Sequence, residues 1–311
     1  MKIAIIIPYI GKFNNYFSLF LSSCEMNPFI DFLFFTDDLT YSKNERSKNI
    51  RFIPSTFDSL KERAQSLFDF NIALNYPYKL CDFRPCYGLM FADYLEGYDY
   101  WGHCDTDMIF GDILSFLSEP MVNNYKRILR HGHLTLYHND VVTNNVFKEY
   151  CDIKQKSYRD VFTDNNSFAF DEAGGSTLIW FANHAKELYD NLSIFRNPSC
   201  YVKSFKYQKH SEILPLRYFY FDKGKLYDCY MKKGKEVKEE ILYVHLFHRK
   251  MSVKDNIDKT SFYIIPNEFL KCKKLSAFLR FRLCFKPLYF EFWFERIKVV
   301  IKRNFKKYGK K

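Results

Sequence analysis

The first 110 residues alternate between apolar runs and amphipathic stretches in a β-α-β-α order. Short runs rich in β-branched and aromatic residues predict buried strands, and apolar residues that recur every three or four positions predict helices. The predicted strands are 2–9, 31–36, 49–53 and 99–110, and the predicted helices are 16–24, 57–70 and 77–94. This order predicts an α/β fold with a doubly wound, largely parallel sheet flanked by helices.

The pattern is less regular after residue 110. Residues 218–222 and 225–230 predict two strands, and Asp222-Lys223-Gly224 between them is typical of a hairpin turn. The other predicted elements are a strand at 134–137, a helix at 144–160, a polar loop at 164–170 and an apolar strand that begins at 241.

Two acids interrupt the strand at 99–110, where Asp105 and Asp107 sit inside an otherwise apolar run. Desolvating a carboxylate is costly, so we expect the strand to end here and the carboxylates to meet a divalent cation. Residues i and i+2 of an extended chain point to the same side, so both aspartates can face one ion. The alternative is a capped turn without a metal.

Ligands of such sheets bind beyond the carboxyl ends of the strands. Tyr9 and Asp37 lie at two of these ends, although Asp37 also suits a turn. In the stretch 77–94, Lys79 and Asp82 have the spacing of one helix face, and Arg84 precedes Pro85 at a predicted helix start. A helix start with cations beside it suits a phosphate, and the alternative is a solvated helix face.

Amino-acid composition indicates the cellular compartment of the protein and where its charge lies along the chain. Nine cysteines without a CxxC pair, and an N-terminus that lacks the layout of a signal peptide, indicate reduced thiols and a cytoplasmic protein. No apolar run is long enough to predict a transmembrane helix. Residues 271–311 hold 14 Lys or Arg against two Glu, an excess of 12, so the +11 chain leaves its first 270 residues at −1. A near-neutral body argues against nucleic acid as a partner.

The stretch 271–311 is therefore expected to be a separate tail beside a domain at 1–270. It interleaves aromatic residues with cations at helical spacing, as in Trp293 and Ile297 against Arg296 and Lys302. Such a helix is expected to lie in an anionic membrane interface, which places the protein on the inner face of the cell membrane. The alternatives are an RNA-binding arm and a terminal helix packed on the domain.

Residues 77–113, PYKLCDFRPCYGLMFADYLEGYDYWGHCDTDMIFGDI, resemble the signature of bacterial polysaccharide glycosyltransferases of the capsule and lipopolysaccharide type. The likeness extends over about residues 2–251. It implies the GT-A fold, a Rossmann-type mixed and mostly parallel sheet, and a nucleotide-diphosphate sugar as donor substrate. By position, Asp105 and Asp107 would bind the metal, and Lys79, Asp82 and Tyr87 would line the nucleotide side.

The resemblance also implies roles further along the chain. His133, in a Gly-His before an apolar strand, would lie beside the donor sugar, or else be a histidine at a sheet edge. Asp171 and Glu172 precede Gly-Gly and would face the acceptor, where one carboxylate orients or deprotonates the attacking hydroxyl. The alternative for Asp171 is helix N-capping.

A third group of residues follows the apolar strand that begins at 241. By family likeness His245 would be a late metal ligand, and Arg249 or Lys250 would contact the diphosphate. The glycine that usually separates these residues is absent, so the choice between Arg249 and Lys250 stays open. The alternative for His245 is a core histidine.

Together these features predict a metal-dependent glycosyltransferase. Its donor would be a nucleotide-diphosphate sugar, most simply a UDP-sugar, and its acceptor a surface-polysaccharide or lipid-linked glycan, with retention of configuration implied by the family. Mixed oxygen and imidazole ligands favour Mn²⁺ over Mg²⁺. One alternative is another nucleotide or phosphosugar transferase, which normally has an early glycine-rich loop. The other is a non-catalytic scaffold that binds membrane or nucleic acid.

Overall fold

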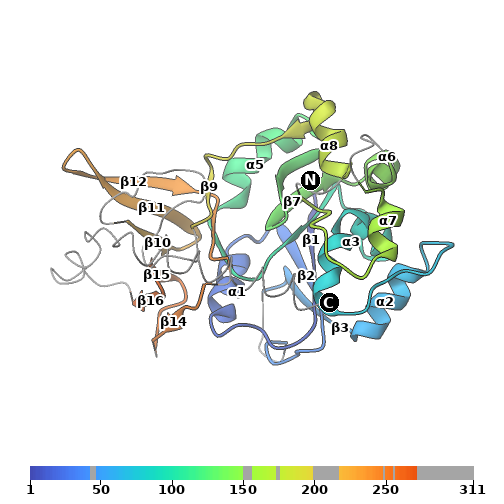
Figure 1. Ribbon diagram of the computed structural model, residues 1–311. Coiled ribbons are helices and arrows are strands. Elements are labelled where there is room, and N and C mark those ends of the chain that lie inside the picture. Colours follow the sequence, from blue (N-terminus) through green and yellow to red (C-terminus); the bar gives the residue numbers. More distant parts are fainter. Residues whose placement is uncertain are drawn as a thin grey trace, which may run out of the picture. The chain divides into compact units, whose positions relative to one another are not determined.

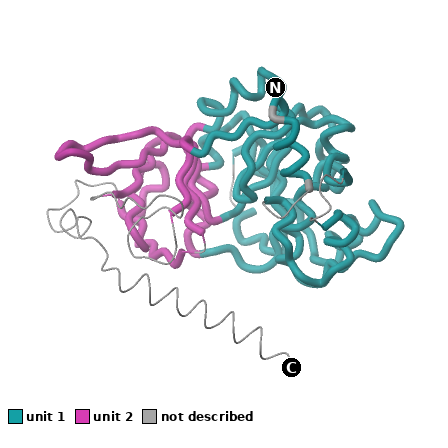
Figure 2. The backbone as a smooth tube through the Cα atoms, turned by 45° about the horizontal axis from the view of Figure 1, so that its top comes forward, with its two compact units in different colours: residues 1–14, 24–106, 113–192 teal, residues 15–23, 107–112, 193–311 magenta. Residues whose placement is uncertain are grey.

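The computed structural model describes residues 1–42, 47–149, 156–172, 176–198, 217–247, 249–254 and 256–271. The chain forms two compact units, coloured separately in Figure 2. Unit 1 comprises residues 1–14, 24–106 and 113–192, and unit 2 comprises 15–23, 107–112 and the chain from 193 onwards. The predicted tail at 271–311 lies outside the described residues, apart from Lys271, so its helical nature stays a prediction. No described helix is long and apolar enough to cross a membrane.

A seven-stranded sheet forms the centre of unit 1, and its strands β1, β2, β3 and β7 are labelled in Figure 1. The strand order is β3-β2-β1-β4-β7-β6-β8. β1, β2, β3 and β4 run parallel, β7 is antiparallel to both β4 and β6, and β6 runs parallel to β8. The predicted α/β class, with a mixed and mostly parallel sheet flanked by helices, is confirmed. The strands are β1 (Ile3–Tyr9), β2 (Ile30–Thr36), β3 (Ile50–Pro54), β4 (Tyr100–Cys104), β6 (Arg127–His131), β7 (Leu134–His138) and β8 (Leu188–Tyr189).

One face of this sheet packs against helices in a continuous apolar core. Side chains of β1, β2, β4 and β7, such as Leu33 and Trp101, meet Leu60 and Ala64 of α2 and Phe162 of α7. The helices are α1 (Phe17–Glu25), α2 (Phe57–Gln65), α3 (Leu80–Phe83), α4 (Tyr87–Met90), α5 (Ile113–Val122), α6 (Val141–Asn145), α7 (Tyr158–Thr163) and α8 (Ser176–Asn183). The 3₁₀ turns are η1 (Pro77–Lys79), η2 (Arg84–Cys86), η3 (Ala92–Tyr94), η4 (Val146–Lys148) and η5 (Ala185–Glu187).

Three predicted helices differ from the structure. α2 ends at Gln65, whose side-chain amide binds the chain that follows. Its Nε2 donates to Phe70 O at 2.8 Å and its Oε1 accepts from Ile72 N at 3.0 Å, so the chain turns here. The stretch 77–94 is a series of short α and 3₁₀ turns, since Pro85 removes a backbone donor in its middle. The predicted helix 144–160 is divided because Ser157 caps the start of a new helix, α7.

The predicted strand 99–110 is broken at the two acids. β4 ends at Cys104 in the sheet of unit 1, and β5 (Met108–Phe110) belongs to a different sheet, in unit 2. The backbone between β4 and β5 makes hydrogen bonds that belong to neither sheet. Asp105 N donates to His133 O at 3.2 Å, and Leu246 N donates to Asp107 O at 2.8 Å. The expectation that the strand ends at the aspartates is correct, and its continuation to residue 110 as one strand is wrong.

The described residues of unit 2 form two sheets, one of six strands in the order β12-β11-β10-β15-β16-β14 and one of three in the order β5-β13-β9. The predicted hairpin is confirmed: β10 and β11 pair antiparallel around Lys223 and Gly224, whose φ values of 47° and 87° suit a two-residue turn. The strands are β9 (Phe195–Arg196), β10 (Tyr218–Asp222), β11 (Lys225–Lys232), β12 (Lys235–Ile241), β13 (Tyr243–His245), β14 (Ser252–Val253), β15 (Ser261–Ile265) and β16 (Glu268–Lys271).

A buried carboxylate joins two arginines within unit 2. Asp228 of β11 has a fully buried side chain and lies 2.6 Å from Arg196 Nε of β9. Arg217 Nε, one residue before β10, donates to the other oxygen of Asp228 at 2.9 Å. Two charge-assisted partners satisfy a carboxylate that would otherwise be costly to bury.

Candidate functional site

Asp107 and His245 face each other because β5 and β13 are paired. The register aligns His245 with Met108, the residue that follows Asp107. His245 Nε2 lies 3.2 Å from Asp107 Oδ1, and the two side chains are 5% and 13% exposed. Two residues far apart in the sequence are thus brought together by backbone pairing.

Asp105 completes a group of three candidate metal ligands. Thr106 alone separates it from Asp107, and one ligand atom from each of Asp105, Asp107 and His245 lies within 4.8 Å of the others. Ligand atoms that bind one ion at about 2.0–2.6 Å can be at most about 5 Å apart, so the spacing fits one shared ion. Two carboxylates and an imidazole suit Mn²⁺ better than Mg²⁺.

Arg84 connects Asp105 with the second acidic motif in unit 1. One guanidinium nitrogen, Nη2, donates to Asp105 Oδ1, and Nη1 donates to Asp171 Oδ2 at 2.8 Å and to Gly132 O at 3.0 Å. The Arg84 side chain is 13% exposed. The sequence predicts Arg84 at a helix start beside a phosphate, but in this structure it pairs with two carboxylates instead.

Asp171 and Glu172 are held in fixed positions beside Gly132. Glu172 Oε1 accepts from Gly132 N at 2.7 Å, and Arg127 Nη2 donates to the backbone oxygen of Asp171 at 3.0 Å. A Cβ on Gly132 would lie 2.3 Å from Asp171 Oδ2, so any side chain there would displace the acid. Burial raises the pKa of Asp171 to about 6, against the opposing charge of Arg84.

His133 lies in the turn between β6 and β7. It is buried, its ring stacks on His131 at 5.0 Å between centroids, and its backbone oxygen accepts from Asp105 N. His103, on β4, is also buried, and its Nδ1 donates to Gly132 O at 3.2 Å. Burial lowers the pKa of His103 well below its usual value, so this histidine is neutral. Its hydrogen bond to Gly132 O supports the turn between β6 and β7.

Lys79, Asp82 and Tyr87 are placed differently from the expectation. Lys79 and Asp82 have side chains with 0% exposure and pair at 2.9 Å. Tyr87 is buried, and its hydroxyl donates to Leu80 O at 3.0 Å. In this structure the three side chains belong to the interior of unit 1, because their polar atoms bond to protein groups and present no surface to a nucleotide.

Tyr9 and Asp37 lie at the carboxyl ends of the adjacent strands β1 and β2. Tyr9 pairs in register with Thr36, and its ring stacks on Phe13 at 4.5 Å. Asp37 is exposed, and its Oδ1 accepts from Gly11 N at 2.8 Å. The two residues therefore lie at the strand ends where a ligand is expected.

Arg249 and Lys250 differ in their surroundings. Arg249 is buried, and its Nη1 donates to Asn267 Oδ1 at 2.7 Å. Lys250 is exposed. Of the two cations, Lys250 is thus the one whose charge is open to an incoming anion.

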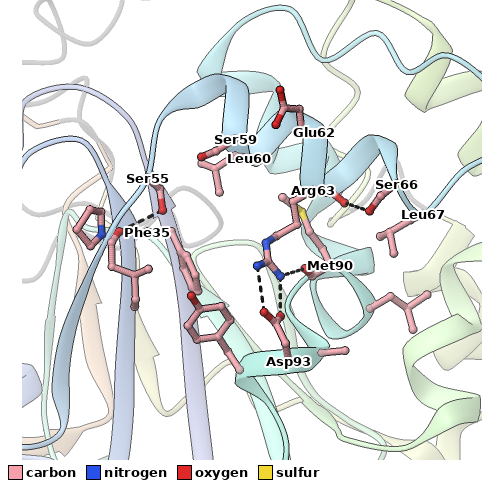
Figure 3. Close-up of a pocket in the computed structure, with 15 residues that line it drawn as sticks. Phe35, Ser55, Ser59, Leu60, Glu62, Arg63, Ser66, Leu67, Met90 and Asp93 are labelled. Carbon is pink, nitrogen blue, oxygen red and sulfur yellow. Dashed lines mark hydrogen bonds and ion pairs between the residues drawn. The ribbon is translucent and has the colours of Figure 1, made fainter.

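A cavity of about 570 Å³ lies elsewhere in unit 1, between α2 and the turn η3 (Figure 3). Arg63 crosses it and binds both oxygens of Asp93, at 2.6 and 3.0 Å. None of the predicted site residues lines this cavity.

Residues 5–273 match DUF6625, a family of unknown function, and the chain belongs to this family. No curated protein matches the chain. Solved structures similar to it include galactosyltransferase LgtC in complex with donor and acceptor sugar analogues, with a TM-score of 0.36 and 14% identity, covering 65% of this chain and 77% of LgtC. An active-site mutant of LgtC has a TM-score of 0.36 and 14% identity, covering 68% and 80% of the two chains. Mouse xyloside xylosyltransferase 1 has a TM-score of 0.37 and 7% identity, covering 64% and 88%.

Proposed function

We propose that the protein is a metal-dependent glycosyltransferase of the GT-A type that moves a sugar from a nucleotide-diphosphate donor to a glycan acceptor. The observation that carries the proposal is the group formed by Asp105, Asp107 and His245, whose ligand atoms lie within 4.8 Å of one another. The motif at 77–113 and the mixed sheet, with the acids at the end of its central strand, support it.

The residues of the site have distinct roles in this proposal. Asp105, Asp107 and His245 would hold Mn²⁺ or Mg²⁺, which supplies Lewis-acid stabilisation of the departing diphosphate. Lys250 adds a positive charge for the same phosphates. Asp171 or Glu172 orients the acceptor hydroxyl or takes its proton; the Asp171 carboxyl, with a pKa of about 6, is ionised at neutral pH and still basic enough to accept one.

The donor and the acceptor are assigned by chemistry and by the resemblance. We propose a UDP-sugar as donor, a surface-polysaccharide or lipid-linked glycan as acceptor, and a retaining reaction. Tyr9 and Asp37 would line the nucleotide side, and His133 the sugar side. Docking of residues 271–311 on the inner face of the cell membrane would bring the site to a lipid-linked acceptor.

Thermal unfolding with a panel of nucleotides and Mn²⁺ tests the class of ligand. UDP or GDP with Mn²⁺ is expected to stabilise the protein by about 2.7 kcal/mol at a concentration about 100 times the Kd, because only the folded state binds. The rise in Tm should depend on Mn²⁺ and be absent with EDTA. A protein that responds to RNA and to none of the nucleotides is a scaffold, and the proposal is then wrong.

Sedimentation with vesicles tests the tail. The full-length chain is expected to pellet with anionic vesicles and to dissociate in high salt, because each basic residue near an anionic surface contributes about 1 kcal/mol. A chain that ends at residue 271 should stay in the supernatant, as should the full chain with neutral vesicles. If both chains sediment with the vesicles, another part of the protein binds the membrane. If neither does, the protein does not bind the membrane, and in both cases the role of the tail is wrong.

A further inference from the structure

Lys79 and Asp82 form an ion pair in the interior of unit 1. Both side chains are fully buried in unit 1, where Nζ and Oδ2 are 2.9 Å apart. Desolvating two charges costs several kcal/mol per ion, and it is offset only if the remaining polar atoms also find partners. The pair therefore depends on further hydrogen bonds from the groups around it.

All the other partners of the pair that we describe belong to one stretch of backbone, residues 161–170. Lys79 Nζ donates to Val161 O at 2.9 Å and to Asn166 O, which with Asp82 accounts for its three protons. Asp82 accepts from Phe168 N, at 3.1 and 3.0 Å to its two oxygens, and from Phe170 N at 3.0 Å. The pair thus binds both the donors and the acceptors of this stretch.

The same stretch leads directly into the acidic motif. Ala169 has a left-handed backbone with φ of 51°, and Glu172 N donates to Ala169 O at 3.0 Å, so residues 169–172 form a tight turn. Asp82 holds the residues on either side of Ala169. A non-glycine residue in this conformation costs free energy, which the surrounding bonds must offset.

We propose that Lys79 and Asp82 are a positioning pair that fixes the turn carrying Asp171 and Glu172, instead of ligands of the nucleotide. Arg84 follows Asp82 by two residues and holds the Asp171 carboxylate directly. The short segment 79–84 therefore fixes both the backbone before Asp171 and its side chain. This role rests on the proposed function, in which those acids act on the acceptor.

The double variant Lys79→Met/Asp82→Leu tests the role, because it removes both charges and leaves none unpaired. The amides of Phe168, Phe170 and Glu172 are expected to lose hydrogen-exchange protection by at least about 10-fold, since their acceptor or their turn is lost. The turnover of sugar transfer should fall by at least about 10-fold, because a misplaced acid cannot orient the hydroxyl. The Kd for nucleotide with Mn²⁺ should stay within about 2-fold of wild type, since no contact to it is removed.

The matched control is Lys126→Met, which removes a lysine from a half-buried pair with Asp140 in the same unit. It should change none of the three quantities. If the double variant does not fold, Asp82→Asn, which keeps one acceptor oxygen, is measured in the same way at low temperature. Unchanged protection of the three amides overturns the proposal, as does a nucleotide Kd that weakens as much as turnover falls. If wild-type protein neither binds nucleotides nor transfers sugar, the proposed function fails, while the exchange measurement still decides whether the pair holds the turn.

Discussion

Replacing Asp107 by asparagine is expected to abolish sugar transfer while leaving the fold intact. The substitution keeps the shape of the side chain but removes its charge, 3.2 Å from His245 Nε2. Loss of one well-placed group that stabilises the charge developing in the transition state lowers the rate by about 100-fold or more. Turnover with excess Mn²⁺, together with the Kd for Mn²⁺, measures the effect, and circular dichroism checks the fold.

Asp58→Asn is the matched control, since Asp58 is an exposed aspartate of α2. It should leave turnover and Mn²⁺ affinity at wild-type values. Near-normal turnover of Asp107→Asn with added Mn²⁺ would contradict the metal assignment and, with it, the proposed function.

Replacing Arg84 by methionine is expected to lower the free energy of unfolding and to shift the pH dependence of both stability and turnover. The Asp171 side chain is 4% exposed and would lose its charged partner. Breaking a buried pair on one side typically costs about 3–5 kcal/mol of unfolding free energy, because the remaining charge is uncompensated. Denaturant unfolding at several pH values measures this cost.

The direction of the pH effect follows from the cause of the shift. Burial raises the pKa of Asp171 to about 6, and Arg84 opposes that rise. The folded protein therefore holds the Asp171 proton more tightly than the unfolded chain, so this group's contribution to unfolding free energy falls as the pH rises from about 4 to about 6. Without Arg84 the pKa rises further, and the decline extends to higher pH.

The pH midpoint of transfer activity should also shift to higher pH in Arg84→Met. If Asp171 must be ionised to act on the acceptor, its pKa of about 6 makes turnover rise with pH around that value in the wild type, and at higher pH in Arg84→Met. Arg63→Met is the control, because Arg63 pairs with Asp93 at a site away from the acids, with 33% and 56% of the two side chains exposed. An unchanged midpoint in Arg84→Met would exclude Asp171 as the group that sets the pH profile.

The sequence predicts best where one local signal dominates. The apolar runs of β1, β2 and β3 and the turn of the β10–β11 hairpin have the predicted boundaries to within about a residue. Asp105 and Asp107 stand out because carboxylates inside an apolar run need a cation or another partner. The role of His245 as a metal ligand is predicted only by the family likeness, because its proximity to Asp107 depends on the pairing of β5 with β13.

Long-range contacts account for what the sequence could not predict. Lys79 and Asp82 have the spacing of a solvated helix face, and nothing in their neighbourhood reveals that residues 161–170 cover them. Arg84 likewise resembles a cation at a helix start, whereas the two carboxylates that it binds are 21 and 87 positions away. A polar residue is exposed or buried according to the tertiary fold, which the local pattern does not encode.

The carboxylate of Asp228 makes unit 2 sensitive to change at a single position. Arg196 and Arg217 both bind it, so one side chain of β11 neutralises two guanidinium groups that are 13% and 5% exposed. An ion pair broken on one side leaves an uncompensated buried charge, which typically costs about 3–5 kcal/mol. One mutation at position 228 would therefore remove the shared counter-charge of two arginines at once.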